Sequence, residues 1–342
     1  MPLPQKIEIS HKTIIFTVFF LLFLWLIWEI HDIIILLFTS FILTSAAQPL
    51  IDRLEHRNVP RALAIMALYV VGIIFLSLTT STILPPLIVQ SVRLGNQLPT
   101  YLSVFLAQFN LGGLNIETLS GQIGPLTQSV VFLTFGIFGN ILSLLTLLVF
   151  TFYFLLERKR LDYYFAHFFG SQLGDRMFSI ILKVEGRLGA WVRGQIILML
   201  IIGIATYIGL LLLGIEYALA LALIAGIMEI VPVVGPIVSA IPAIIVALAI
   251  SPSPLVALGV VGLYFVIQQL ENHLIVPTVM RKAVGLPPIV TLVALMVGGR
   301  IGGIIGAILA VPVLVTILVI VREVFPGSPV AFEPPPQKNT PG

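Results

Sequence analysis

The chain contains no cysteine and little charge. Only 10% of its 342 residues are Asp, Glu, Lys or Arg, and the formal net charge is +3. The lack of cysteine excludes disulfides, thiolate chemistry and cysteine metal sites. Because the Lys and Arg residues are confined to a few connections, they indicate membrane topology and not a surface for nucleic acid.

The sequence signatures of common enzymes are also missing. There is no H-E-x-x-H, G-x-S-x-G or G-x-x-x-x-G-K-[ST] motif, and no pair of aspartates within an apolar run. We therefore predict a protein that is not an enzyme, with no catalytic residues, no cofactor and no bound metal. Without a nucleotide-binding loop, active transport would depend on an ion gradient or on energy from other subunits.

Apolar residues, in contrast, make up 58% of the chain, and the mean hydropathy is +1.12. A globule of this size could not bury so much apolar surface, and several apolar runs are long enough to cross a bilayer. The composition therefore predicts an all-α polytopic integral membrane protein that is located in the cell membrane and surrounded by the lipid bilayer.

Polar residues divide the apolar sequence into about eight membrane segments, about six full spans and two broken stretches. The predicted full spans are residues 13–28, 33–49, 62–84, 130–156, 194–213 and 255–275, and the broken stretches are residues 218–250 and 288–321. The corresponding regions are a cytoplasmic N-terminus (1–12), N-terminal membrane helices (13–84), an external helical segment (85–129), a membrane helix (130–156), a cytoplasmic amphipathic segment (157–193), a transport core (194–325) and a disordered Pro-rich tail (326–342).

The distribution of Lys and Arg predicts the orientation. The connection 157–193 is rich in both, whereas 85–129 contains a single basic residue, Arg93. By the positive-inside rule, the connection 157–193 and both termini are cytoplasmic. For all connections to lie on their predicted sides, each broken stretch must return to the side from which it entered. Arms of about 14 residues reach about 21 Å, less than the hydrocarbon thickness, so we favour two re-entrant hairpins over pairs of short spans.

Amphipathic helices are predicted in two connections, 87–109 outside and 176–191 inside, because apolar residues recur there at helical spacing. Each helix could lie at the membrane interface or form a contact between subunits. We expect a homo-oligomer.

The first broken stretch contains the strongest candidate for a binding site. Its middle holds Glu229, Pro232, Gly235 and Pro236, which form the tip of the predicted hairpin. A helix interrupted within hydrocarbon is stable only where its freed backbone groups face protein or water, and an ionisable side chain beside such a break is a functional candidate. Glu229 could carry a proton or bind a cation. The alternative is a structural Glu229 that caps the freed N–H groups.

Two other groups of polar residues are candidates. Gln268, Glu271 and Asn272 are spaced to share one helix face, which could hydrogen-bond a polyol or coordinate a cation, or could mark the membrane boundary. Arg300 lies among glycines at the tip of the second hairpin. A buried Arg300 would need Glu229 or Glu271 as a partner, whereas an unpaired one would extend to an interface.

Three ordered motifs resemble those of a known family. They are E-I-V-P-V-V-G-P at 229–236, Q-Q-L-E-N-H-L-I-V-P-T-V-M at 268–280 and G-G-R-I-G-G-I-I-G-A-I-L-A-V-P at 298–312, and they are similar to motifs of the autoinducer-2 exporter (AI-2E) family, the PerM-like permeases. The likeness extends over nearly the whole chain. It implies a secondary transporter of the bacterial cytoplasmic membrane that exports a small polar solute, with the quorum-sensing signal autoinducer-2 as the candidate.

Two other functions stay open. Some members of the family are described as sodium or lithium/proton antiporters, so a monovalent cation or a proton is the alternative partner of the site. A non-transporting membrane scaffold is the third alternative, although broken helices with buried charge have no evident use in a scaffold.

Overall fold

The computed structural model describes residues 11–108, 141–232, 234–250, 254–280 and 287–325. Every regular element in these ranges is a helix, as predicted. The helices are α1 (His11–Glu29), α2 (His31–Glu55), α3 (Arg61–Gln108), α5 (Ile141–Glu157), η1 (Arg158–Arg160), α6 (Leu161–Phe169), α7 (Ser171–Leu212), α8 (Ala218–Met228), α9 (Val234–Ile250), α10 (Pro254–Leu270), the π-helix η2 (Glu271–Ile275), α11 (Val276–Val279) and α12 (Pro288–Val324).

The described part of the chain has 5 helices that are long and apolar enough to cross a membrane. They are Lys12–Glu29, His31–Glu55, Ser171–Leu212, Pro254–Val279 and Ile289–Val324, and shorter apolar helices lie at Arg61–Phe75, Ala218–Met228 and Val234–Leu248. This confirms a polytopic, all-helical membrane protein. The predicted external segment beyond residue 108, the start of the predicted span 130–156 and the predicted disordered tail lie outside the described residues.

Two helices are longer than the sequence predicted. In α7, the predicted cytoplasmic segment up to residue 193 and the predicted span 194–213 form one continuous helix of 42 residues. In α3, a helix of 48 residues includes Pro85 and Pro86, where the predicted span ends. Tertiary contacts override local propensity here. The distal half of α3 is held by its contacts with α8 and α9.

Two glutamines of α3 make these contacts with the beginning of α8. The Gln90 side-chain oxygen accepts a hydrogen bond from the Ala220 backbone N–H over 3.2 Å, and the Tyr217 hydroxyl donates to the Gln97 side-chain oxygen over 2.6 Å. Because the first N–H groups of a helix have no partner within that helix, a side chain from α3 supplies an acceptor that α8 lacks.

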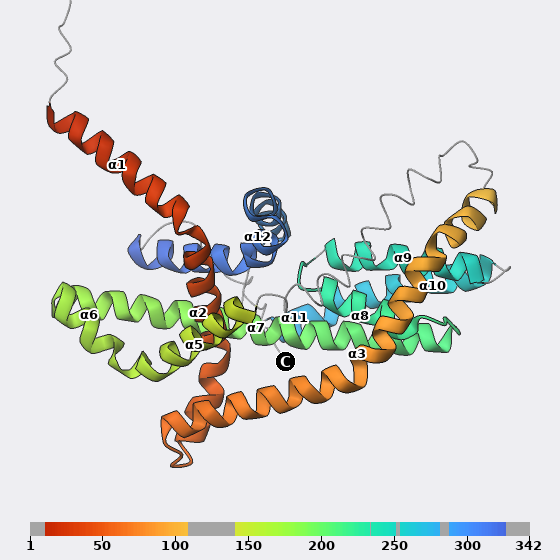
Figure 1. Cartoon of the computed structure of the whole chain (residues 1–342), viewed down its shortest axis with the longest axis horizontal. Helices are drawn as coiled ribbons and strands as arrows, with labels where there is room; N and C mark the ends of the chain where they lie inside the picture. Colours follow the sequence, from red (N-terminus) through yellow and green to blue (C-terminus); the bar gives the residue numbers. More distant parts are fainter. Residues whose placement is uncertain (1–10, 109–140, 233, 251–253, 281–286, 326–342) are drawn as a thin grey trace, which may run out of the picture.

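The long helix α7 is the central element of the molecule (Figure 1). It contacts α2, α6 and α12 as well as α8, α10 and α11. Figure 1 shows α8, α9 and α10 along one end of α7, and α5 and α6 near the other. Helix α7 therefore connects the N-terminal helices to the broken stretch that contains Glu229.

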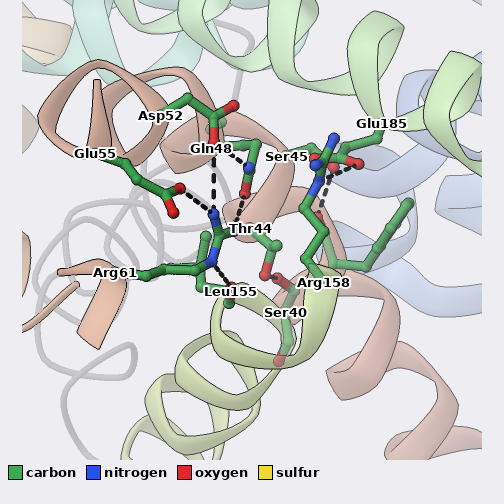
Figure 2. A network of polar contacts seen from close by, with 12 residues as sticks. Ser40, Thr44, Ser45, Gln48, Asp52, Glu55, Arg61, Leu155, Arg158 and Glu185 are labelled. Atoms are coloured by element: carbon green, nitrogen blue, oxygen red, sulfur yellow. Dashed lines mark hydrogen bonds and ion pairs between the residues drawn. The ribbon is translucent and has the colours of Figure 1, made fainter. Parts of the chain in front are cut away.

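A network of polar contacts holds α2, α3 and α5 together, with Arg61 at its centre (Figure 2). The Arg61 side chain is 9% exposed. It donates to the Leu155 backbone oxygen over 2.7 Å, to the Gln48 side-chain oxygen over 3.0 Å and to Glu55 over 3.2 Å, and it lies 3.5 Å from Asp52. All of these acceptors face one guanidinium group, so Arg61 joins three helices.

A second ion pair connects this region to α7. Arg158 donates from Nε to both carboxylate oxygens of Glu185, over 2.8 and 3.0 Å, and the Glu185 side chain is only 7% exposed. Lys159, the next residue, pairs with Glu55 of α2. The basic residues after α5 therefore bind carboxylates of two other helices.

Helix α2 and helix α7 also touch through their backbones. Pro49 lies inside α2 and has no N–H, so the Ser45 carbonyl four residues earlier lacks its usual donor. Arg193 of α7 donates to the Ser45 and Ala46 carbonyls over 3.3 and 3.2 Å. Gly189 permits the approach, because a Cβ added there would lie 2.8 Å from the Ser45 carbonyl carbon.

The second broken stretch forms α12, which bends where the sequence predicted a hairpin tip. Gly302 and Gly303 have non-helical backbone angles, and the φ of Gly303 is 58°. On either side of this bend, Gly298 and Gly306 pack against each other's backbone. The two parts, residues 288–301 and 304–324, are unequal, whereas the sequence predicted two arms of similar length.

The second part of α12 packs along the first half of α7. The buried apolar cluster between α2, α7 and this part of α12 consists of Ile42, Val184, Leu188, Trp191, Val311 and Val315. Lys183 pairs with Glu323 over 2.6 Å, and Arg176 donates to the Glu323 backbone oxygen over 3.0 Å. The predicted amphipathic face of 176–191 is thus buried against protein.

Candidate functional site

The break in the first broken stretch lies between α8 and α9, and Glu229 is the first residue after α8. The sequence predicted this position from Pro232, Gly235 and Pro236. Glu229 is 1% exposed and belongs to the largest fully buried side chains of the described residues. A carboxylate therefore sits in the interior of the helix bundle, at a point where the regular backbone ends.

The backbone of the break satisfies its own hydrogen bonds. The N–H groups of Ile230, Val231, Val234 and Gly235 donate to backbone carbonyls over 2.9 to 3.1 Å. The Glu229 side chain caps none of these N–H groups, and its Oε2 atom has no hydrogen-bond partner in the described residues. This arrangement differs from the structural alternative, in which the Glu229 side chain would cap the freed N–H groups.

Close packing holds the two sides of the break together. Gly235 is buried, and a Cβ added there would lie 2.9 Å from the Glu229 nitrogen, so only glycine fits. Pro236 is buried, and its carbonyl accepts a hydrogen bond from the Ser239 hydroxyl over 3.1 Å. Pro232 is half-buried within the turn. These residues shape the break and contribute no free polar side-chain atom to it.

Gln195 of α7 is hydrogen-bonded to Glu229. Its side-chain amide donates to the Glu229 backbone oxygen over 2.6 Å. Gln195 is 3% exposed, and its Oε1 atom has no partner in the described part of the chain. The structure thus places two unpartnered acceptor oxygens, one from Gln195 and one from Glu229, on residues that touch each other.

Glu271 is a second buried carboxylate, and it lies near enough to Glu229 for the two groups to interact electrostatically. It is 4% exposed and begins the π-helix that follows α10. Gln268 donates to Glu271 over 3.4 Å. Short π-helical segments within longer helices are frequent at functional sites.

Asn272, in contrast, is exposed. The sequence grouped Asn272 with Gln268 and Glu271 by α-helical spacing. In a π-helix the hydrogen bonds run from i to i+5, so residues four apart no longer lie above one another. The structure therefore brings Gln268 and Glu271 together and excludes Asn272.

The structure does not bring Arg300 to this site. Arg300 is exposed on α12, and no ion pair joins it to Glu229 or Glu271 in the described ranges. Helix α12 packs on the half of α7 that precedes Gln195, which separates the tips of the two broken stretches. The predicted partnership of Glu229 and Arg300 is absent from this arrangement.

The candidate site contains two buried carboxylates of like charge, Glu229 and Glu271. Among the described residues, no Lys, Arg or His pairs with Glu229 or Glu271. Two buried carboxylates near each other cannot both be ionised without a compensating group. The same part of the chain also contains no group of three or more acidic or His side chains that could hold a metal ion. The site is suited to a proton, a monovalent cation or a donor group of a solute.

Sequence reasoning missed two polar residues of α7, Gln195 and Thr206. Both are buried, and each has an unpartnered side-chain oxygen. The available signal was their position within the apolar run G-Q-I-I-L-M-L-I-I-G-I-A-T that begins at Gly194. Uncharged polar residues in membrane helices commonly bond to neighbouring helices, so this signal alone does not indicate a binding site.

Comparisons with known proteins identify the family of the chain. The model of a family described as AI-2E family transporter matches residues 14–325. The candidate transport protein YueF of Bacillus subtilis is 27% identical over 268 residues, which cover 72% of this chain and 72% of YueF. YrrI, a second candidate transport protein of Bacillus subtilis, is 26% identical over 282 residues, 78% of each chain. The candidate permease PerM of Escherichia coli K12 is 29% identical over 109 residues, 32% of this chain and 31% of PerM. The family model covers most of the sequence, and the chain therefore belongs to the AI-2E transporter family.

Proposed function

We propose that this protein is a secondary transporter of the bacterial cytoplasmic membrane that exports a small polar solute, with Glu229, Glu271 and Gln195 as the centre of its binding site. Membership of a transporter family supports the general class. The family resemblance makes the autoinducer-2 signal the candidate solute. Pro232, Gly235, Pro236 and Gln268 shape or support the site.

The observation that carries the proposal is the presence of two buried carboxylates that form no ion pair with any described residue. A buried ion without a partner is strongly unfavourable, so each carboxylate requires a proton, a cation or a ligand donor. Each of these species can be exchanged with solution. A protein that needed Glu229 and Glu271 only for stability would gain more from an apolar pair of the same size.

We further propose that both broken stretches are re-entrant and that both termini are cytoplasmic. Helix α8 has 11 residues and is about 17 Å long, too short for a hydrocarbon core of about 30 Å. The pairing of Lys183 with Glu323 supports a cytoplasmic end of α12, because Lys183 lies in the connection that is rich in basic residues.

A sodium or lithium/proton antiporter is the second candidate, and a specific observation favours it. The unpartnered atoms of the site, Oε2 of Glu229 and Oε1 of Gln195, are both oxygen acceptors. Carboxylate and carbonyl oxygens suit hard cations and protons, and they do not discriminate the shape of an organic solute.

Flux measurements with purified protein in liposomes test both candidates. One set of liposomes is loaded with autoinducer-2, and its release is measured. A matched set contains a pH-sensitive dye and receives pulses of Na⁺, Li⁺ or K⁺. Release of autoinducer-2 supports the exporter, and a pH change that requires Na⁺ or Li⁺ supports the antiporter. If the signals of both sets are the same with and without protein, the non-transporting scaffold is the remaining alternative.

A further inference from the structure

The buried face of α7 points into the space between α8 and α10. Gly209 of α7 lies against the Leu263 side chain of α10, whereas Gly203 lies on the side of α8, near Ala222. At about 100° per residue, Gln195 and Thr206 fall within about 20° of each other, between these two directions. Both side chains therefore face the seam where α8 and α10 meet on α7.

Thr206 is unusual among the threonines of these helices. Helical threonines commonly donate to the carbonyl four residues earlier. Thr39, Thr44, Thr146, Thr151, Thr278 and Thr316 do so over 2.6 to 2.9 Å. Thr206 is 0% exposed, and its Oγ1 atom has no hydrogen-bond partner in the described residues. Its hydroxyl is thus buried in the seam and is free to bind a ligand.

An apolar layer separates the two polar positions. Ile202 of α7, Ala225 of α8 and Ile267 of α10 form one buried cluster. Ile202 lies between Gln195 and Thr206 in sequence and on the same face of α7. The two polar residues are about 17 Å apart along the helix, so the layer lies between two separate binding positions.

We propose that the seam between α8 and α10 is a translocation route, with Gln195 at one binding position, Thr206 at a second, and the layer of Ile202, Ala225 and Ile267 as the barrier between them. This inference rests on the proposed transport function. The species that moves along the route carries hydrogen-bond donors or positive charge, because the unpartnered Gln195 side-chain oxygen is an acceptor and the Thr206 hydroxyl oxygen can also accept. Hydrated monovalent cations and hydroxyl-bearing solutes share this chemistry.

The position of the carboxylates supports the route. Glu229 ends α8 and is bonded to Gln195, and Glu271 follows α10 directly, so the two acidic residues lie toward the same end of the seam. In the proposed orientation this is the cytoplasmic end, and Thr206 lies toward the outside. A species would therefore pass from the carboxylates across the apolar layer to the Thr206 hydroxyl.

Cysteine accessibility tests the route directly, because the natural chain contains no cysteine and has no background reaction. The variant Thr206→Cys, in the full-length protein in intact cells, should react with a cationic, membrane-impermeant methanethiosulfonate. Ile65→Cys is the matched control, since Ile65 is also 0% exposed but lies in the buried apolar cluster of α2, α3 and α5, away from the seam. It should not react. Adding Ile202→Ala should make Thr206→Cys reactive from the cytoplasmic side as well.

A second variant keeps the test informative if the thiol disturbs folding. Thr206→Val replaces the hydroxyl with a methyl group of similar size. Because the hydroxyl makes no hydrogen bond, the thermal unfolding temperature should stay the same or rise. Flux of the transported species should fall about three- to tenfold, as expected for the loss of one hydrogen bond.

The results separate this route from the general function. If Thr206→Cys is as unreactive as Ile65→Cys and Thr206→Val transports at the normal rate, the route is wrong, even in a working transporter. If Thr206→Cys reacts from outside and Ile202→Ala opens the second side, the route stands, whether or not autoinducer-2 or Na⁺ proves to be the substrate.

Discussion

The Gln195 side chain donates to the backbone carbonyl of Glu229 over 2.6 Å. This hydrogen bond fixes the end of α8 to the middle of α7, a continuous helix of 42 residues. Two residues earlier, Arg193 holds the Ser45 carbonyl of α2. Less than one turn of α7 therefore contacts both the N-terminal helices and the candidate site. A rotation of α7 against α2 would move Gln195 relative to Glu229.

The first prediction concerns Glu229 itself. Glu229→Gln keeps the shape of the side chain but cannot exchange a proton or neutralise a cation, so coupled flux should fall at least about tenfold and lose its pH dependence. The protein should fold normally, because an amide is less costly to bury than an uncompensated carboxylate. The measurement is flux in liposomes together with the thermal unfolding temperature.

Glu216→Gln is the matched control, because Glu216 is exposed in the turn between α7 and α8. It should transport like the natural protein. Normal flux with normal pH dependence in Glu229→Gln would show that the titration of Glu229 plays no part in transport.

The second prediction concerns the contact between α2 and α7. In Gly189→Ala the added methyl group would collide with the Ser45 carbonyl, and overpacking of this kind costs about 1–3 kcal/mol. We expect a lower thermal unfolding temperature. Gly186→Ala lies in the same helix, where an added Cβ meets no atom within 4 Å. This control should gain about 0.5–1 kcal/mol from its better helix propensity. Equal shifts in both variants would contradict the close backbone contact.

Local sequence features were sufficient to predict both breaks. Proline and glycine act on the backbone within a few residues, and the breaks occur after Met228 and at Gly302–Gly303, where the sequence placed them. The burial of Glu229 was expected for a carboxylate within an apolar run. Each of these conclusions depends on neighbouring residues alone.

The partners of these residues could not be predicted from local pattern. Gln195 reaches Glu229 only because α7 and α8 pack side by side. The π-helix at Glu271 removes Asn272 from the predicted face, and periodicity assumes α-helical spacing. Arg300 stays away from Glu229 because α12 packs on the other half of α7. Tertiary packing decides all three outcomes.

The third prediction concerns the network around Arg61. Arg61→Ala would leave the Leu155 carbonyl, Gln48 and Glu55 without their shared donor, and the side chain is only 9% exposed. A buried group that loses a charged hydrogen-bond partner costs about 1–3 kcal/mol, so the thermal unfolding temperature in detergent should fall by several degrees.

Arg57→Ala provides the comparison for Arg61, since Arg57 is an exposed arginine in the same connection. Its unfolding temperature should change little. If both variants unfold like the natural protein, Arg61 does not hold α2, α3 and α5 together.

The fourth prediction concerns orientation. Helix α7 has 42 residues and is about 63 Å long, twice the hydrocarbon thickness, so its two ends cannot both lie in the bilayer. Its first half carries basic residues and pairs with Glu323, and its second half is apolar. We expect Ser171→Cys, which is exposed at the beginning of α7, to be labelled by an impermeant thiol reagent only in inverted membrane vesicles. Glu216→Cys, just beyond the other end, should be labelled only in intact cells. Labelling of both thiols from one side would place both ends of α7 on the same face of the membrane. The predicted sides of the connections, from which the two re-entrant stretches were inferred, would then be wrong.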